Sequence, residues 1–321
     1  MRPPRILAAL GAPDRGRLLI AIGGLHGNEP SGVKASLEVG AELSARVDAG
    51  LELGGRFVAL AGNRGALAVG ERYLDRDLNR MWAGVDLAHA EQDAPGAGGG
   101  PRERAELREL KTEIDAELSR ATDEVCLLDL HSTSAPGAPF CIIGDAPRNL
   151  DVAAAIGVPA LLGLEGTVAG TLLAHFGAGG APARRARIAL CLEGGENQSP
   201  LTVAHHAAAL RCVLVELGIA PAEAFVTLED DRALLARASH GLPACVEVLY
   251  RHALARGESF SMLPGFSNFQ AVAAGELLAR SDRAGGMDVR APFDGLLVMP
   301  RYQGRGEDGF FLGRAADGAP A

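Results

Sequence analysis

The stretch IAIGGLHGNEPSG, residues 20–32, joins an apolar run to a glycine-rich bend that carries His26 and Glu29 three residues apart. The run begins earlier, as RLLIAIGG, and is apolar on both faces, which is typical of a strand in a sheet that is covered on both sides. In α/β folds, ligands bind beyond the carboxyl ends of such strands. This stretch therefore predicts an α/β fold and places a candidate site at the end of its first buried strand.

The same alternation continues through the first two-thirds of the chain. Strand-like runs are GRFVALAGN, EVCLLDLHS, PFCIIG and RIALCLEGG. Helix-like segments lie at residues 29–50, 101–123 and 199–218; the second begins with Pro101 and the third ends at Gly218, as helices prefer. Strands that alternate with helices predict an α/β domain with a largely parallel or mixed sheet.

The pattern changes from about Ala220. Short strand-like runs such as ACVEVLYRHAL, MDVRAPFDGLLVMP and GFFLGR are separated by Gly, Pro and Asp, which predicts a smaller β-rich domain. We therefore expect two domains, residues 1–220 and 221–321. The second resembles the barrel-sandwich fold of biotinyl and lipoyl domains. Those carrier domains need a lysine on their central hairpin, and residues 221–321 contain no lysine. The resemblance therefore concerns the fold and does not imply a carrier function.

Composition excludes several classes of partner. The chain has 321 residues, 48% of them hydrophobic, and a formal net charge of −9, which argues against a nucleic-acid or anionic-membrane partner. No apolar run is long enough to span a bilayer, and the amino-terminal stretch does not resemble a signal peptide. The five cysteines are scattered without a CxxC motif and are interpreted as reduced core thiols. A cytoplasmic protein is expected.

A possible metal site is formed by His26, Glu29 and His131, each just past an apolar run. Two histidines and one carboxylate are a ligand combination found in catalytic zinc sites. Three protein ligands leave the fourth coordination position of the metal open for water. We expect Gly27 to free the backbone so that His26 and Glu29 converge. Asp129, two residues before His131 and on the same side of the strand, is either a further candidate ligand or a residue that orients a ligand histidine from behind. Without further information, these residues are equally compatible with a zinc site and with ordinary polar side chains that bind no metal. Co, Mn or Ni would suit the same ligands.

The last strand-like run ends in two acidic residues, Glu193 and Glu196, in LEGGE. Either is a candidate general base.

A second cluster, GNRGALAVGERYLDRDLNRMW at residues 62–82, holds four arginines. Arginine presents a planar fork of donors that suits a carboxylate or an oxyanion. Three acidic residues are interleaved with these arginines, so a salt-bridged surface is the alternative and is favoured on the charges alone.

Three motifs together resemble those of the succinylglutamate desuccinylase and aspartoacylase family, a branch of the zinc carboxypeptidase fold. They are GGLHGNEPSG, GERYLDRDLNRMW and LLDLHSTS, in the family's order, and the late GEDGFFLGR resembles the ending of many bacterial members. The resemblance covers most of the chain. It implies a three-layer, zinc-carboxypeptidase-like α/β domain with a mixed sheet, and a smaller C-terminal β-rich domain that caps the active site.

The resemblance also implies roles in catalysis. His26, Glu29 and His131 would bind one Zn²⁺ per chain. Arg72 would polarise the scissile carbonyl and stabilise its oxyanion. Glu193 would act as general base and then general acid.

Three further residues would contact the substrate. Asn79 and Arg80 would hold its carboxylate, and Tyr302 would close the pocket. The chain departs from aspartate-selective members, because the segment before the catalytic glutamate offers Arg184 and Arg185 but no tyrosine. An acyl-aspartate substrate is therefore doubtful.

We thus expect a zinc-dependent hydrolase that releases the acyl group of a small N-acylated amino acid or related carboxylate compound, through an amide or an ester bond. A zinc carboxypeptidase-type peptidase and a non-catalytic metal-binding protein are the alternatives. Glu196 is the rival of Glu193 as the base. A homo-oligomer is compatible with the sequence, which does not fix the oligomeric state.

Overall fold

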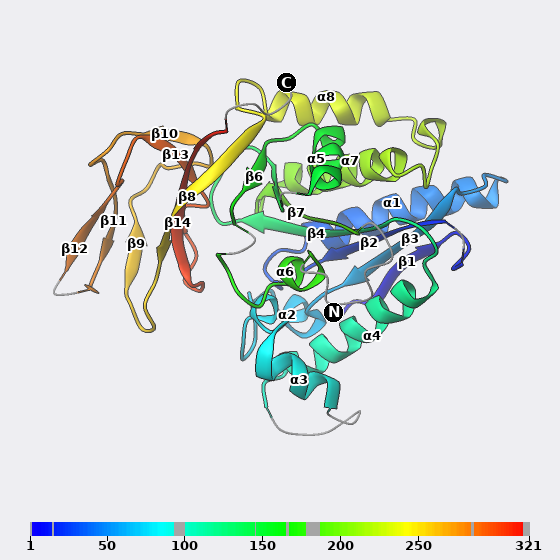
Figure 1. Cartoon of the computed structure of the whole chain (residues 1–321), viewed down its shortest axis with the longest axis horizontal. Coiled ribbons are helices and arrows are strands. Elements are labelled where there is room, and N and C mark those ends of the chain that lie inside the picture. The colour runs from blue at the N-terminus through cyan, green and yellow to red at the C-terminus, as the bar shows by residue number, and fades with distance from the viewer. Residues whose placement is uncertain are drawn as a thin grey trace.

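The computed structural model of the chain (Figure 1) describes residues 2–14, 16–92, 100–144, 146–164, 167–177, 187–283 and 286–316. Its central feature is an 11-stranded mixed sheet in the order β1-β3-β2-β4-β7-β5-β6-β8-β14-β13-β10. The strands of its first part are β1 (Ile6–Leu10), β2 (Arg17–Gly23), β3 (Gly55–Ala61), β4 (Val125–Thr133), β5 (Phe140–Ile143), β6 (Ala160–Leu162) and β7 (Arg187–Glu196). Strands β3, β2, β4 and β7 are mutually parallel, so their carboxyl ends meet at one edge.

Helices cover both faces of this sheet, as Figure 1 shows. The longer helices are α1 (Ser31–Asp48), α3 (Gly84–Gln92), α4 (Glu103–Arg120), α5 (Pro147–Ile156), α7 (Pro200–Glu216) and α8 (Leu228–Ala238). The short ones are α2 (Arg64–Val69), α6 (Leu172–Gly177) and the 3₁₀ turns η1 (Leu78–Arg80) and η2 (Ala222–Ala224). Helices α1, α5, α7 and α8 lie on one side of the sheet, and α3, α4 and α6 lie on the other.

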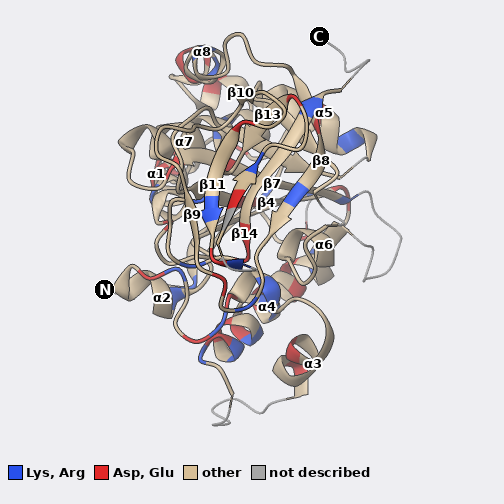
Figure 2. Ribbon diagram, turned by 90° about the vertical axis from the view of Figure 1, so that its left-hand side faces the viewer, with Lys and Arg blue, Asp and Glu red and all other residues tan. Residues whose placement is uncertain are grey.

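Each face of the sheet has its own hydrophobic core because successive strand residues point to opposite faces. Leu19 and Ala21 of β2 belong to the core beneath α1 and α7, whereas Ile20 and Ile22 belong to the core over α4. Helix α4 presents apolar residues to that second core at helical spacing. Charged residues are interspersed along the same helix (Figure 2), and three of its glutamates, Glu103, Glu106 and Glu117, are buried. The two cores fix the strands that carry the site.

The C-terminal part extends the central sheet and adds a second one. Strands β8 (Cys245–Ala253), β14 (Asp308–Ala315), β13 (Gly295–Val298) and β10 (Gln270–Val272) continue the central sheet. Strands β9 (Phe260–Met262), β11 (Leu277–Ser281) and β12 (Met287–Arg290) form a separate antiparallel sheet, which projects at the left of Figure 1.

The predicted fold class is confirmed: the chain is an α/β protein with a mixed sheet and a small C-terminal antiparallel sheet. The predicted strands and helices of the first two-thirds all form. The boundary at residue 220 stays a prediction, and the central sheet continues beyond it through β8. Strands β1 and β6 and helices α2, α3, α5, α6 and α8 are not among the predicted elements. Within the described ranges, no helix combines the length and the apolar character that crossing a bilayer requires.

Candidate metal and catalytic site

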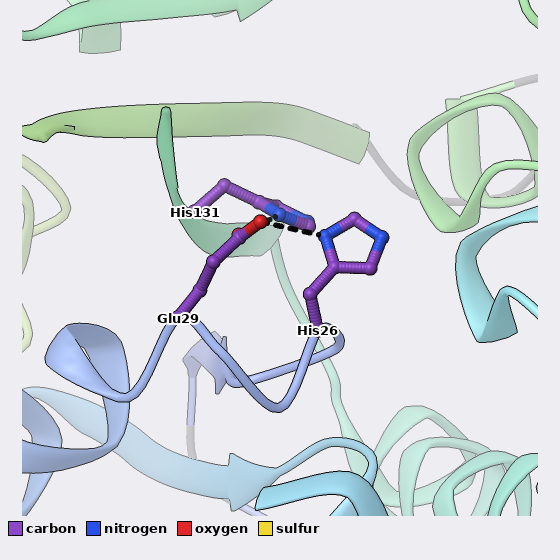
Figure 3. A group of neighbouring side chains, drawn as sticks. All are labelled: His26, Glu29 and His131. Carbon is purple, nitrogen blue, oxygen red and sulfur yellow. Dashed lines mark hydrogen bonds and ion pairs between the residues drawn. The ribbon is translucent and has the colours of Figure 1, made fainter. Parts of the chain in front are cut away.

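His26 and Glu29, which follow the end of β2, converge with His131, which lies near the carboxyl end of β4, and each is almost fully buried. Figure 3 shows the Glu29 carboxylate between the two imidazole rings. Glu29 Oε1 lies 3.0 Å from His26 Nδ1, and Glu29 Oε2 lies 2.8 Å from His131 Nδ1. One candidate ligand atom from each residue lies within 4.8 Å of the others. The structure therefore brings together the three residues that the sequence predicts as ligands.

The outer nitrogen of each histidine faces a second carboxylate. His131 Nε2 lies 2.9 Å from Asp129 Oδ2, as predicted, and His26 Nε2 lies 3.0 Å from Asp77 Oδ1. Such outer carboxylates fix the ring orientation and the tautomer of a ligand histidine. From the sequence, Asp77 is only one of the acidic residues interleaved with the arginines. Its position in the arginine-rich motif gave no signal that it faces His26.

Opposite charges set the ionisation of these groups. Burial by itself would raise the pKa of Glu29, but His26 and His131 outweigh it and lower that pKa. Burial would likewise lower the pKa of His131, but Asp129 and Glu29 raise it well above its ordinary value. The Glu29 carboxylate is thus ionised, as a metal ligand must be, whereas His131 has to release its proton when it binds a metal.

Two glycines shape the bend that carries His26 and Glu29. Gly24 has φ = 73°, in the left-handed region that favours glycine. Gly27 has no such φ; instead, a Cβ there would lie 2.1 Å from the backbone carbon of Ala66 in α2. The expectation that Gly27 supplies backbone freedom is therefore wrong: glycine is needed at that position because α2 packs directly against the bend.

Glu193 enters the site from β7, where it is the register partner of His131 on β4. It is buried, lines the same cavity as the three candidate ligands, and its Oε2 has no hydrogen-bond partner among the described residues. Burial raises the pKa of Glu193 to about 8; the charges of Glu29 and Asp129 add to the rise, and His131 and Arg72 oppose it. Glu196 is exposed and does not line the cavity.

The arginine motif is divided between the cavity and the surface. Arg72 lines the cavity and pairs with Glu29 (3.3 Å) and Asp77 (3.2 Å). Arg80 also lines the cavity, whereas Arg64 and Arg76 form salt bridges with α4 and α3 residues. The motif thus contains two arginines that face the cavity, Arg72 and Arg80, and two that form salt bridges with the neighbouring helices, Arg64 and Arg76.

The backbone of this motif is held by Glu103 at the start of α4. This buried carboxylate accepts N–H bonds from Leu74 (2.6 Å), Asp75 (3.2 Å) and Arg76 (3.1 Å). An anion at a helix amino terminus also interacts favourably with the helix dipole. Glu103 therefore fixes the loop from which Arg72, Asp77 and Arg80 reach the site.

The side chains of Asn79 and Arg80 both have hydrogen-bond or ion-pair partners within the protein. The Asn79 side-chain oxygen accepts the Leu172 N–H at 2.8 Å, and its Nδ2 lies 3.4 Å from His131 Nε2. Arg80 pairs with Glu307 at 3.0 Å and lies 3.7 Å from Asp308. Both residues line the cavity, but neither presents an unused charge to it.

Tyr302 does not line the cavity. Its hydroxyl donates to the Leu263 carbonyl at 2.8 Å and accepts the Phe266 N–H at 2.9 Å, on the side of the small C-terminal sheet. Its neighbours Arg301 and Gln303 line the cavity instead. Arg184 and Arg185 lie outside the described residues.

The donor set fits a zinc ion. Two imidazoles and one carboxylate are converging, buried and backed by outer carboxylates, as in catalytic zinc sites. A second group, Asp129, His131 and Cys191, also lies within 4.8 Å. It shares His131 with the first group, and burial holds the pKa of the Cys191 thiol well above its ordinary value. The first group is therefore the candidate metal site.

Comparisons with known proteins agree with this geometry. Residues 15–220, more than half of the chain, match the model of the succinylglutamate desuccinylase/aspartoacylase catalytic domain. A succinylglutamate desuccinylase of Pseudomonas aeruginosa is 40% identical over 76 residues, which are 23% of this chain and 22% of the relative. A probable aspartoacylase of Acaryochloris marina is 30% identical over 139 residues, 43% of this chain and 42% of the relative. The match thus spans less than half the length of these curated relatives.

Solved structures share the whole fold. A succinylglutamate desuccinylase from Chromobacterium violaceum superposes with a TM-score of 0.60 at 20% identity, covering 96% of this chain and 88% of that one. The product-bound ectoine utilization protein EutE (DoeB) from Ruegeria pomeroyi gives 0.58 at 18% identity, covering 96% and 87%. At such identities the likeness shows the fold alone.

Proposed function

Because the chain belongs to the succinylglutamate desuccinylase/aspartoacylase family, we propose that it is a zinc-dependent hydrolase that removes the acyl group from a small N-acylated amino acid or related carboxylate compound. One observation carries the proposal: the three candidate ligands and the buried carboxylate of Glu193 line a single cavity. The names of the relatives support an amide bond between an acyl group and an amino acid.

His26, Glu29 and His131 would hold the zinc ion. When bound, zinc acts as a Lewis acid that polarises a carbonyl group and makes water more acidic. Asp77 and Asp129 keep the two imidazoles in orientation through their outer nitrogens.

Glu193 would act as the general base and then as the general acid. Its Oε2 is free to receive the proton of the attacking water. The protonated carboxyl group could then transfer that proton to the leaving amine. Glu196, outside the cavity, has no access to either proton.

Arg72 would stabilise the negative charge that develops on the carbonyl oxygen. Its ion pairs with Glu29 and Asp77 hold the guanidinium in place before the substrate arrives. Preorganised charge of this kind is a large contribution to catalysis because no reorganisation is needed in the transition state.

The cavity favours a small substrate over a peptide. Met299, Pro300, Arg301 and other residues of the C-terminal part line it together with the strand-end residues. A carboxypeptidase-type enzyme would need room for a peptide chain on one side of the scissile bond, so residues of the C-terminal part in the cavity wall favour a small substrate over this alternative. The non-catalytic alternative requires Glu193 to be dispensable.

Elemental analysis of the wild type beside His26→Ala, followed by a screen of N-acyl amino acids, tests the proposal. We expect about one zinc per chain in the wild type, almost none in the variant, and release of a free amine from at least one compound. If protein purified without chelator contains no metal and takes none up when zinc is added, the mechanism is overturned. A wild type that binds zinc but hydrolyses only peptides would favour the alternative.

A further inference from the structure

Among the described residues, three arginines line the cavity: Arg72, Arg80 and Arg301. Two of them are neutralised within the protein. Arg72 pairs with Glu29 and Asp77, and Arg80 pairs with Glu307 and lies near Asp308. A substrate carboxylate that approached either of these arginines would have to compete with a carboxylate of the protein.

Arg301 has no such partner in the part of the chain that the structure describes. Its Nη1 donates to the Gly306 carbonyl at 3.2 Å, its Nη2 donates to the Phe260 carbonyl at 3.4 Å, and its buried Nε has no acceptor. The guanidinium lies 5.3 Å from the centre of the Phe260 ring. Burial and the charge of Arg72 lower the pKa of Arg301, and the charges of Asp308 and Glu258 oppose this fall. Neither of these two carboxylates forms a salt bridge with Arg301, so its charge is compensated less directly than those of Arg72 and Arg80.

The loop that carries Arg301 is fixed to the rim of the cavity. Met299 has φ = 50°, an unfavourable value for a residue with a side chain. Its N–H donates to Asn268 Oδ1 at 2.7 Å, and Asn268 Nδ2 donates to Thr133 Oγ1 at 3.0 Å, at the end of β4. The Tyr302 N–H donates to Ser134 Oγ at 2.9 Å. Strain that is held in place by its surroundings often marks a functional position.

We propose that Arg301, rather than Arg80, binds the carboxylate of the substrate. The proposal rests on the proposed function, since it names the anchor for the substrate of that same site. A carboxylate in the cavity would neutralise the charge of Arg301, which has no ion-pair partner among the described residues, through a charge-assisted hydrogen bond from the guanidinium. Arg80 would then be a positioning residue that ties the arginine motif to the C-terminal part through Glu307.

The test compares an N-acetyl amino acid that the wild type hydrolyses with its carboxamide, which lacks the negative charge. Zinc-loaded wild type, Arg301→Ala, Arg301→Lys, Arg80→Ala and Arg305→Ala are each assayed on both compounds. Arg305 is the matched control: it is an exposed arginine of the same loop, it stacks on Tyr73, and it does not line the cavity. Zinc content and melting temperature are recorded for every variant.

We expect Arg301→Ala to raise KM for the acid by about 10- to 100-fold, as for the loss of a charged hydrogen bond, and to change KM for the carboxamide little. Arg301→Lys should lie between wild type and Arg301→Ala, and Arg305→Ala should match the wild type. The inference is overturned if Arg80→Ala alone discriminates acid from carboxamide, or if both Arg301 variants affect the two compounds equally. If the wild type hydrolyses no N-acyl amino acid, the proposed function itself fails.

Discussion

His131 and Glu193 are register partners on the adjacent parallel strands β4 and β7. The register shifts immediately afterwards, because the next pair is Thr133 of β4 with Glu196 of β7, which leaves one extra residue on β7. The candidate metal ligand and the candidate base are therefore set side by side by the backbone hydrogen bonds of the sheet. Because both strands are buried on both faces, their register is strongly specified, and the relative position of the two groups does not depend on a flexible loop.

The first prediction concerns Glu193. Replacing it with Gln keeps the size of the side chain but removes the basic oxygen. We expect Glu193→Gln to lose about 10²- to 10⁴-fold in kcat, as for the loss of general acid–base catalysis, while zinc content stays at the wild-type level.

Glu196→Gln is the control, because Glu196 lies three residues further on and outside the cavity. It should have near wild-type activity. Normal turnover by Glu193→Gln, with the metal retained, would remove Glu193 from the mechanism and revive the non-catalytic alternative.

The parts of the molecule that the sequence predicts well are those with a local signal. The apolar runs that become β2, β4 and β7 have no polar face, so they read as buried parallel strands, and whatever follows them lies at the same edge. That reasoning alone brings His26, His131 and Glu193 together. The short strand β6 and the edge strand β1 lack such a signal: β6 has three residues and β1 is half-exposed.

Other features depend on which distant side chain lies opposite. Asp77 and Arg80 belong to one arginine-rich motif, yet Asp77 faces His26 and Arg80 faces Glu307. No periodicity distinguishes them. Arg301 and Tyr302 are adjacent in sequence, but Arg301 lines the cavity and the Tyr302 hydroxyl donates to the Leu263 carbonyl on the side of the small sheet. The partner of each of these side chains depends on tertiary packing, so the spacing of residues in the sequence does not predict it.

The second prediction concerns Gly27. A Cβ at this position would lie 2.1 Å from the backbone carbon of Ala66, so α2 or the bend must move. We expect Gly27→Ala to lower the free energy of unfolding by about 1–3 kcal/mol, as overpacking does, and to weaken zinc binding because His26 and Glu29 shift. Urea denaturation and metal analysis measure the two effects. Gly304→Ala is the control, since no atom lies within 4 Å of its Cβ; equal behaviour of the two variants would refute the packing argument.

The third prediction concerns the carboxylate behind His131. Asp129 Oδ2 lies 2.9 Å from His131 Nε2. Asp129→Asn keeps the shape but removes the charge that makes the imidazole a better ligand. We expect zinc affinity to fall by about 10- to 100-fold, measured by competition with a chromogenic chelator. Asp288→Asn, at an exposed position on β12, should bind zinc as the wild type does. An unchanged affinity in Asp129→Asn would show that this carboxylate only fills space.

The fourth prediction concerns acid stability and His206 of α7. This residue is fully buried, its Nε2 lies 2.9 Å from the His131 carbonyl oxygen, and its Nδ1 has no partner among the described residues. Burial lowers the pKa of His206 from 6.5 to about 4. Between these two values the unfolded chain binds a proton that the folded chain does not, so the free energy of unfolding rises with pH. The stability that neutral His206 provides is therefore complete above pH 6.5 and is lost as the pH falls toward 4.

Chemical denaturation of the metal-free protein between pH 7 and pH 5 measures this contribution, because chelator removes any effect of acid on metal binding. One pKa unit corresponds to about 1.4 kcal/mol, so the wild type should lose about 2 kcal/mol from this residue by pH 5. His206→Gln retains a donor for the His131 carbonyl but has no proton to gain, so its stability should depend less steeply on pH. His240→Gln changes an exposed histidine and should follow the wild type. Parallel profiles for wild type and His206→Gln would mean that acid destabilises the fold through other groups, such as the carboxylates around His26 and His131.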